Sequence, residues 1–89
     1  MATPEQPPRA AALRYRKGET APSLVASGRG YVADAILAAA EEAGIPVRED
    51  AVLVEALAHL ELGDRVPPEL YQAVAEALAW AYNLTRRRA

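Results

Sequence analysis

Apolar side chains recur at helical spacing most clearly between Tyr31 and Ala43. They stand at i, i+3, i+4, i+7, i+8 and i+11, the spacing that places residues on one face of an α-helix. Gly44 follows where a left-handed residue commonly ends a helix, and Pro46 prevents the helix from continuing. The pattern therefore predicts a helix over Tyr31–Ala43. Its apolar face would comprise Val32, Ala35, Ile36, Ala39, Ala40 and Ala43.

A second helix is predicted after Asp50, because a carboxylate at the N-cap position accepts a hydrogen bond from an otherwise free backbone N–H. Glycine commonly ends a helix, so Gly63 is expected to stop it. The apolar face of this helix would comprise Leu53, Ala56, Leu57 and Leu60.

A third helix is predicted to start at Pro67 and Pro68, because proline is tolerated in the first turn of a helix. Two neighbouring apolar lines follow at helical spacing, which predicts a buried face. One line comprises Tyr71, Ala75, Leu78 and Tyr82, and the other comprises Leu70, Val74, Ala77 and Ala81.

Three short segments are candidate strands. The first, Arg9–Tyr15, alternates imperfectly, and its alanines suit a helical turn equally well. The second lies within Ser23–Ser27, around Leu24 and Val25, and the third is Ile45–Arg48, directly after the first helix. A strand that follows a helix at once is typical of α/β layer folds. We therefore expect an α/β fold in which a small mixed β-sheet of about three strands is packed by about three helices.

A chain of 89 residues is long enough for one compact domain. Residues 1–8 hold three prolines and few apolar side chains, a composition typical of a flexible lead-in. We expect the folded domain to span residues 9–84. Residues 85–89 are predicted to form a frayed basic tail, with arginines placed favourably at the negative end of the last helix.

Composition excludes several classes of site. The chain has no cysteine, so disulfides, thiol catalysis and thiolate metal sites are absent. A formal net charge of -2 disfavours nucleic-acid binding, which normally needs a basic excess. No apolar run approaches the roughly 20 residues that cross a bilayer, and the N-terminus lacks the features of a signal peptide. We expect a cytoplasmic protein with no membrane span, no metal and no cofactor.

The sequence presents no catalytic constellation. His59, the single histidine, lies off the apolar face of the second predicted helix, and no cysteine or second histidine completes a metal site or a nucleophile pair. Gly28-Arg29-Gly30 precedes a helix and could cradle an anion, but it lacks the third glycine of a dinucleotide fingerprint and the lysine of a P-loop. A tight turn is the favoured interpretation of these glycines. The chain is predicted not to be an enzyme.

Aromatic residues indicate a candidate partner surface, because tyrosine and tryptophan are enriched where proteins bind each other. The candidates are Tyr71 and Trp80, together with Arg14 on the first predicted strand. Trp80 lies away from the line that contains Leu78 and Tyr82. It either packs beneath the N-terminal strand or marks a partner surface, and the sequence leaves both open.

Four segments in collinear order resemble one protein family. They are A-L-R-Y at Ala12–Tyr15, A-P-S-L-V-A-S-G-R-G at Ala21–Gly30, G-I-P-V-R-E-D at Gly44–Asp50, and L-x-L-G-D-R-V-P-P-E-L-Y-Q-A-V-A-E-A-L-A-W-A-Y at Leu60–Tyr82. The chain is thereby similar to the cytoplasmic C-terminal domain of FlhB, the substrate-specificity switch of flagellar export, and to the equivalent proteins of injectisome type III secretion. In that family the domain is a small sheet wrapped by helices.

The chain departs from the family at two points. Full-length members carry an N-terminal transmembrane region, to which nothing in this sequence corresponds. They also carry an Asn-Pro-Thr-His motif, in which the asparagine side chain attacks its own carbonyl and the chain breaks before the proline. In collinear register these positions fall on Glu5, Gln6, Pro7 and Pro8, and the single asparagine is Asn83. We therefore expect a stand-alone relative that is unable to cleave itself.

The resemblance implies a non-enzymatic binding module of the export apparatus. Its expected partners are export-apparatus proteins or export substrates, with no nucleic acid. The chain is expected to be a monomer or a weak homodimer that pairs through the exposed edge of the first strand. The alternative is a small nucleic-acid-binding or anion-binding protein that uses Arg29, Arg48 and the arginines at 86–88.

Overall fold

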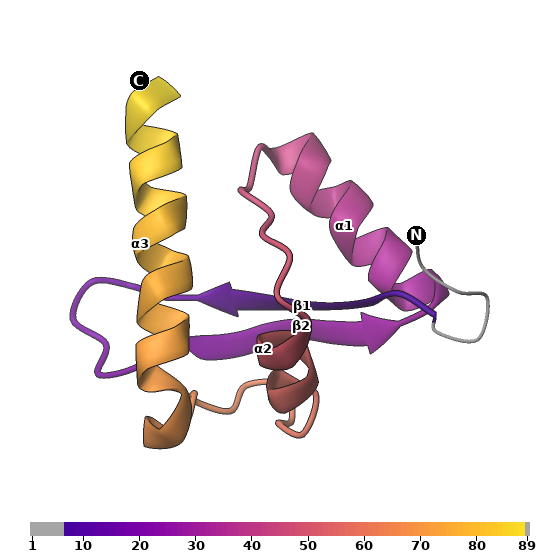
Figure 1. Ribbon diagram of the computed structural model, residues 1–89, viewed down its shortest axis with the longest axis horizontal. Helices are drawn as coiled ribbons and strands as arrows, with labels where there is room; N and C mark the ends of the chain where they lie inside the picture. Colours follow the sequence, from indigo (N-terminus) through magenta and orange to yellow (C-terminus); the bar gives the residue numbers. More distant parts are fainter. Residues whose placement is uncertain (1–6, 89) are drawn as a thin grey trace.

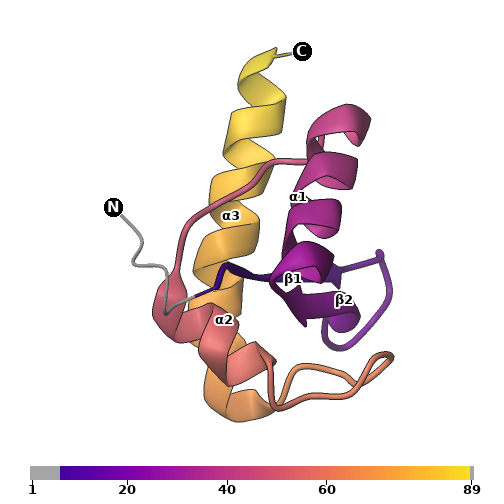
Figure 2. The ribbon, with the colours of Figure 1, turned by 90° about the vertical axis from the view of Figure 1, so that its right-hand side faces the viewer.

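The computed structural model describes residues 7–88. Its elements in chain order are β1 (Arg9–Arg14), β2 (Ser23–Arg29), α1 (Tyr31–Ala43), α2 (Ala51–Leu57), the 3₁₀ turn η1 (Pro68–Leu70) and α3 (Tyr71–Arg88). Helices α2 and α3 lie beside one face of the β1–β2 hairpin, and α1 rises from its other side (Figures 1 and 2). The predicted class, a small α/β domain with three helices, is confirmed.

Strands β1 and β2 pair in antiparallel fashion, with Arg9 opposite Arg29 and Arg14 opposite Ser23. The register shifts between Ala12 and Leu13, which lie opposite Ala26 and Leu24, so that Val25 is the extra residue of a β-bulge. A shift of one residue exchanges the faces of a strand. Side chains beyond the bulge therefore change sides relative to Leu24, and Ser27 and Arg29 join Leu24 on the face that α2 and α3 cover.

A third segment pairs with β2 along its other edge. The backbone N–H of Leu24 donates to Asp64 O at 2.9 Å, and Leu24 O accepts from the N–H of Gly63 at 2.8 Å. The N–H of Val66 donates to Pro22 O at 2.9 Å. Residues 63–66 thus extend the hairpin as a short antiparallel partner, which forms a single β-bridge between Ser23 and Arg65 rather than a full strand.

The prediction of a third strand at Ile45–Arg48 is wrong. The segment belongs to no ladder, and the ladder that the described residues form has two strands, β1 and β2. The N–H of Ile45 turns back to Ala40 O at 2.8 Å, and Pro46 has no N–H to donate. Residues 63–66, rather than 45–48, pair with the open edge of β2, and Ile45 and Val47 are exposed by 59% and 48%.

The main core lies between the hairpin and the pair α2 and α3. It is a cluster of five buried side chains: Leu24, Leu53, Leu57, Val66 and Val74. Leu24 is completely buried at its centre. Ala11 and Leu13 of β1 pack against this cluster, in keeping with the bulged register. Residues from four separate segments therefore meet around one leucine of β2.

The ends of the first two helices follow the predicted chemistry. Helix α1 has the predicted bounds, and Gly44 ends it in the left-handed conformation at φ 72°, ψ 23°. The Asp50 carboxylate accepts from the N–H of Leu53 at 3.0 Å, which confirms the predicted N-cap of α2. Helix α2 ends at Leu57, however, before the expected stop at Gly63. Gly63 instead takes a positive φ where the chain turns to pair with β2.

The apolar face that predicted α1 is largely not the face that packs. Ala33, which lies outside that face, is completely buried, whereas Val32 is exposed by 54%. Ile36 and Ala40 are half-buried, and Ala35, Ala39 and Ala43 are exposed. Only the first turns of α1 lie against the strands, because the helix rises away from them (Figure 1). Its fit depends on Gly28 of β2, which has no side chain to collide with Val32.

Of the two apolar lines on the last helix, the structure buries the one that contains Val74. Leu70 and Ala77 of this line pack against the core, as do Ala73, which lies on neither line, and Leu78 of the other line. On the other line Tyr71 and Tyr82 are exposed by 45% and 66%. Helical periodicity alone could not choose between the lines, because both are apolar and they are adjacent.

The predicted domain limits, residues 9–84, stay a prediction, and the described chain extends beyond both of them. The lead-in predicted at residues 1–8 lies outside the described residues up to position 6, and Pro8 O accepts from the N–H of Gly30 at 2.8 Å. Helix α3 continues to Arg88, through the residues predicted to fray. Within residues 7–88 no helix combines the length and apolarity that crossing a membrane requires.

Gly28→Ala is expected to lower the free energy of unfolding by about 1–3 kcal/mol, as overpacking does in other cores. A Cβ at position 28 would lie 2.7 Å from Val32 Cβ and closer still to Cγ1. Urea unfolding followed by circular dichroism measures the loss. The double variant Gly28→Ala/Val32→Ala should recover part of it, because alanine removes Cγ1 of Val32 but keeps its Cβ. A double variant no more stable than Gly28→Ala would contradict this packing.

Candidate functional site

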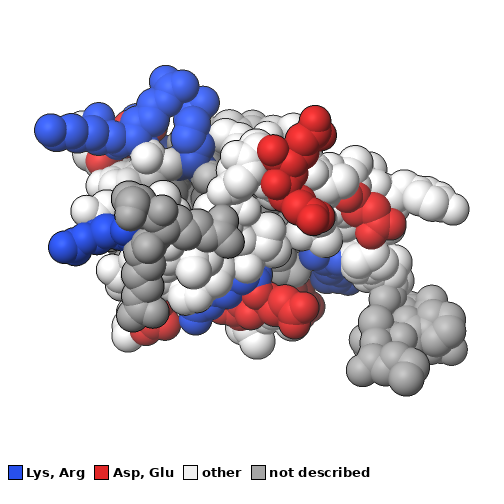
Figure 3. Space-filling model, turned by 90° about the horizontal axis from the view of Figure 1, so that it is seen from above, with Lys and Arg blue, Asp and Glu red and all other residues white. Residues whose placement is uncertain are grey.

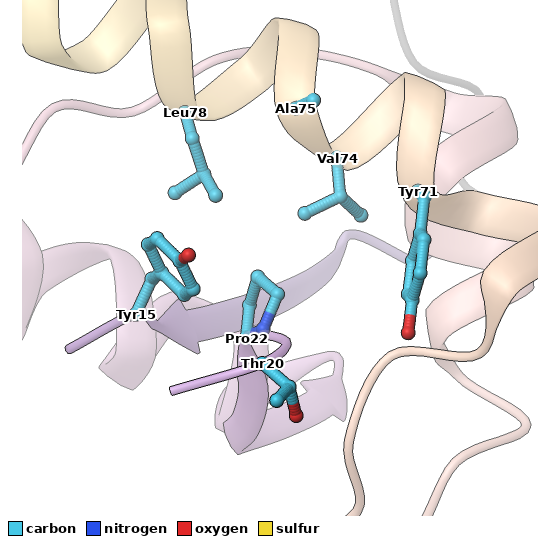
Figure 4. A pocket seen from close by; sticks show the side chains of 7 residues that line it. All are labelled: Tyr15, Thr20, Pro22, Tyr71, Val74, Ala75 and Leu78. Carbon is cyan, nitrogen blue, oxygen red and sulfur yellow. The ribbon is translucent and has the colours of Figure 1, made fainter. Parts of the chain in front are cut away.

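An apolar pocket lies between α3 and the loop that joins β1 to β2. It encloses about 370 Å³ and is lined by Tyr15, Thr20, Pro22, Tyr71, Val74, Ala75 and Leu78. Figure 4 shows Leu78 and Tyr15 pointing toward each other across it, with Val74 above Pro22 and the Tyr71 ring at one side. Its volume falls within the range of about 300–1,000 Å³ that is usual for binding pockets.

The hairpin side of the pocket is set by a tight turn. The N–H of Glu19 donates to Arg16 O at 3.0 Å, and the N–H of Arg16 donates to the Glu19 carboxylate at 3.0 Å. Gly18 supplies the positive φ of 93° inside the turn. This doubly bonded turn brings Tyr15, which follows β1, to the same side as Pro22, which precedes β2.

The α3 side of the pocket is a row of residues at helical spacing. Tyr71, Ala75 and Leu78 stand at i, i+4 and i+7, so they share one side of the helix. The small Ala75 between two larger side chains leaves the space of the pocket open. Val74 belongs both to this wall and to the core. The position of the pocket is therefore coupled to the packing of the core.

The chemistry of the pocket suits apolar groups. The polar side-chain groups of its lining residues are two tyrosine hydroxyls and the Thr20 hydroxyl, which accepts from Arg65 Nη1 at 3.2 Å. His59 is exposed and does not line the pocket. Across the part of the chain that the structure describes, no three His, Asp or Glu side chains gather as a metal site would require. The pocket can hold an apolar side chain and exclude water from it.

The structure separates the three residues of the predicted partner surface. Tyr71 lines the pocket, and Arg14 is exposed next to the lining residue Tyr15. Trp80 is half-buried and is not a lining residue. It follows Leu78 by two positions, about 200° around the helix, which places it on the opposite side of α3. A role of these residues in partner binding stays a prediction.

Sequence reasoning missed most of the hairpin side of the pocket. Tyr15, Thr20 and Pro22 flank a loop, and loop residues carry no periodic signal. The one available signal was the alternation of β1, which ends in an aromatic residue directly before the turn. That signal could mark Tyr15 as a surface aromatic but not name its partners on α3.

A second, smaller hollow of about 170 Å³ lies at the opposite end of the hairpin. Its lining comprises Arg9, Ala10, Ser27, Gly28, Arg29, Val54 and Ala58. Arg29, one of the arginines of the anion-binding alternative, is among them, whereas Arg48 is not.

The surface seen in Figure 3 carries charges of both signs, with basic side chains toward the β1–β2 loop and acidic ones over α1. This face therefore carries mixed charge, and nucleic-acid binding stays a prediction without support from it.

Comparison with known proteins assigns the chain to a protein family. A family model described as "FlhB HrpN YscU SpaS Family" matches residues 8–81, which is most of the chain and includes every residue of the apolar pocket. The chain belongs to this family.

Two relatives differ greatly in length. YlqH of Bacillus subtilis, an uncharacterized protein, is 43% identical over 83 residues, which cover 90% of this chain and 89% of YlqH. The flagellar biosynthetic protein FlhB of Escherichia coli is 43% identical over 79 residues, which cover 86% of this chain but 21% of FlhB. The chain thus spans about a fifth of the FlhB relative and nearly all of YlqH.

Solved structures agree with the predicted resemblance to the C-terminal domain. The PscU C-terminal domain superimposes with a TM-score of 0.76 at 34% identity, covering 81% of this chain and 94% of PscU. A mutated EscU/SpaS C-terminal domain superimposes with a TM-score of 0.80 at 29% identity, covering 90% of this chain and 99% of the other. The fold is that of the C-terminal domain of these FlhB-family proteins.

Ala75→Glu is expected to close the apolar pocket while changing the free energy of unfolding by no more than about 0.5 kcal/mol, because Ala75 is an exposed helical residue. NMR titration with benzene should shift the methyl signals of Val74 and Leu78 in the wild-type chain and leave them unmoved in the variant. Equal shifts in both proteins would show that the pocket does not take up apolar groups.

Proposed function

We propose that this chain is a non-enzymatic binding module of the flagellar or type III export machinery, acting on the cytoplasmic side of the membrane. Its apolar pocket would receive an apolar segment of an export-apparatus protein or of an export substrate. The observation that carries the proposal is the pocket between Tyr15, Tyr71 and Leu78, which lies wholly within the family match. Membership in a family that includes the flagellar protein FlhB supports the assignment to this pathway.

The composition of the pocket supports binding of a protein segment. Tyrosine contributes a large apolar surface at low conformational cost, and it is enriched among residues that dominate binding energies. Tyr15 and Tyr71 are both about half exposed, at 53% and 45%, so each can cover an incoming side chain. The two tyrosines stand at opposite sides of the pocket, and apolar side chains line the space between them. Such a pocket favours an extended segment or a helix that inserts one or two apolar residues.

The immobilised wild-type chain should retain either the cytoplasmic domain of the export gate, the resident FlhB-type switch protein or an export substrate at micromolar concentration. Ala75→Glu should abolish retention, because the added carboxylate would be buried against the apolar partner. Ala51→Glu is the matched control: it adds the same group at an exposed position in the first turn of α2, where negative charge is favourable. Failure of the wild type to retain any of the three, or retention by Ala75→Glu, would overturn the proposal.

We also propose that the chain does not cleave itself. Cleavage in the family uses an asparagine that precedes a proline, and the corresponding positions here are Glu5 and Gln6. The single asparagine, Asn83, lies in α3 and is followed by leucine. Its backbone is held in helical geometry, and no proline follows it.

The purified chain should therefore keep its full mass when it is incubated at neutral pH and 37 °C for several days. Intact-mass spectrometry measures this directly. The C-terminal domain of an FlhB relative that carries Asn-Pro-Thr-His, incubated in parallel, is the positive control. A fragment pair produced by a break within residues 5–8 of this chain would contradict the expectation.

The outer edge of β1 is a second candidate contact. Among residues 7–88 the backbone of β1 pairs with β2 alone. Such an edge can accept a strand from another molecule. Arg9 and Arg14 stand at its two ends, and charged side chains discourage pairing between edges. A monomer or at most a weak homodimer through this edge is the oligomeric state that we propose.

A further inference from the structure

Arg9 and Arg29 form a like-charged pair at the open end of the hairpin. The two residues lie directly opposite each other in the ladder. The neighbouring pair, Pro8 and Gly30, is joined by the hydrogen bond from Gly30 N–H to Pro8 O at 2.8 Å. Bonded and non-bonded pairs alternate along an antiparallel ladder, so Arg9 and Arg29 form a non-bonded pair, in which side chains stand closest.

Like charges opposite each other destabilise a sheet, so this arrangement calls for a compensating group. Both arginines line the 170 Å³ hollow, and no Asp or Glu lines it. Across residues 7–88 neither guanidinium has a hydrogen-bond acceptor. The rest of the lining comes from Ala10, from Ser27, which carries a hydroxyl, from Gly28 and from Val54 and Ala58 of α2.

The β-bulge at Val25 brings these groups together. Without it, Ser27 and Arg29 would lie on the α1 side of the hairpin rather than on the α2 side with Leu24. With the bulge, Arg9, Ser27 and Arg29 line one hollow, whose far wall is α2. Arginine matches the geometry of carboxylate and phosphate with paired N–H donors, and an anion between two arginines removes their mutual repulsion.

We propose that Arg9, Arg29 and Ser27 form a binding site for an oxyanion, either a phosphate or a carboxylate group, at this end of the hairpin. The site is separate from the apolar pocket, which lies at the loop end of the same strands. It needs no partner protein, so its test is independent of the export function proposed above.

Titration with sodium phosphate, followed by ¹H–¹⁵N NMR, tests the site in the intact chain. The amide signals of Ser27, Gly28 and Arg29 should shift in a saturable manner, and sodium chloride at matched ionic strength should leave them in place. A parallel titration with sodium acetate distinguishes phosphate from carboxylate as the preferred group. Equal shifts with chloride would overturn the proposal, because they would reflect ionic strength alone.

Arg29→Gln should weaken phosphate binding by at least about tenfold, since it removes one charged donor of the pair. It should also raise the midpoint of thermal unfolding in phosphate-free buffer, because the repulsion with Arg9 is lost. A purely structural role for Arg29 would lower that midpoint instead. The matched control is Arg14→Gln, at the other end of β1 opposite the neutral Ser23.

Arg14→Gln should bind phosphate as the wild type does. Unchanged binding by Arg29→Gln, or equal weakening by Arg14→Gln, would overturn the proposed site.

Discussion

The pairing of Leu24 with the chain just before α3 is the interaction on which the rest of this domain depends. Both backbone groups of Leu24 are bonded to residues 63–66, and its side chain is the completely buried centre of the core. The same short ladder joins Pro22 to Val66, which places a wall of the pocket beside a core residue. Through these three bonds, the position of β2 determines where α3 crosses the hairpin and where the pocket forms.

The two faces of the hairpin are packed by different means. On the α2 and α3 side, leucines and valines from four segments fill the core. On the α1 side, alanine and glycine allow close approach, with Ala10 and Ala33 buried and Gly28 leaving room for Val32. A domain of this size buries only a modest fraction of its surface, so each such fit is a substantial part of its stability. Because of the bulge in β2, this short strand places Leu24 and Ser27 on the side of α2 and α3 and Gly28 on the side of α1.

Family membership and local geometry address different aspects of function. The FlhB-type C-terminal fold is present, while the lack of self-cleavage is a proposal that rests on the expected correspondence of the family's cleavage motif with Glu5, Gln6, Pro7 and Pro8. The described residues present an apolar pocket at the loop end of the hairpin and a pair of arginines at its open end. The apolar pocket is completed by α3 and the hollow beside the arginines by α2, so an apolar and a cationic feature lie at opposite ends of one hairpin.

Local features determined the elements that the sequence predicts correctly. The end of α1 at Gly44 and the start of α2 at Asp50 rest on backbone conformation and a hydrogen bond between residues close in sequence. These interactions involve a few consecutive residues, so their signals can be read without knowing the fold. The resemblance to the FlhB family likewise rests on sequence motifs alone, and it predicts the overall architecture, a small sheet wrapped by helices.

Tertiary structure decided which faces are buried and which residues meet. The strand expected at Ile45–Arg48 does not form, and the open edge of β2 pairs instead with residues 63–66, about forty residues away in sequence. That pairing determines where α3 crosses the hairpin. The position of α3 in turn decides that Val74 is buried while Tyr71 is exposed, and that Tyr15 lines a pocket together with residues of α3. Sequence periodicity ranks faces of an isolated helix, whereas burial depends on the neighbours that long-range contacts bring to it.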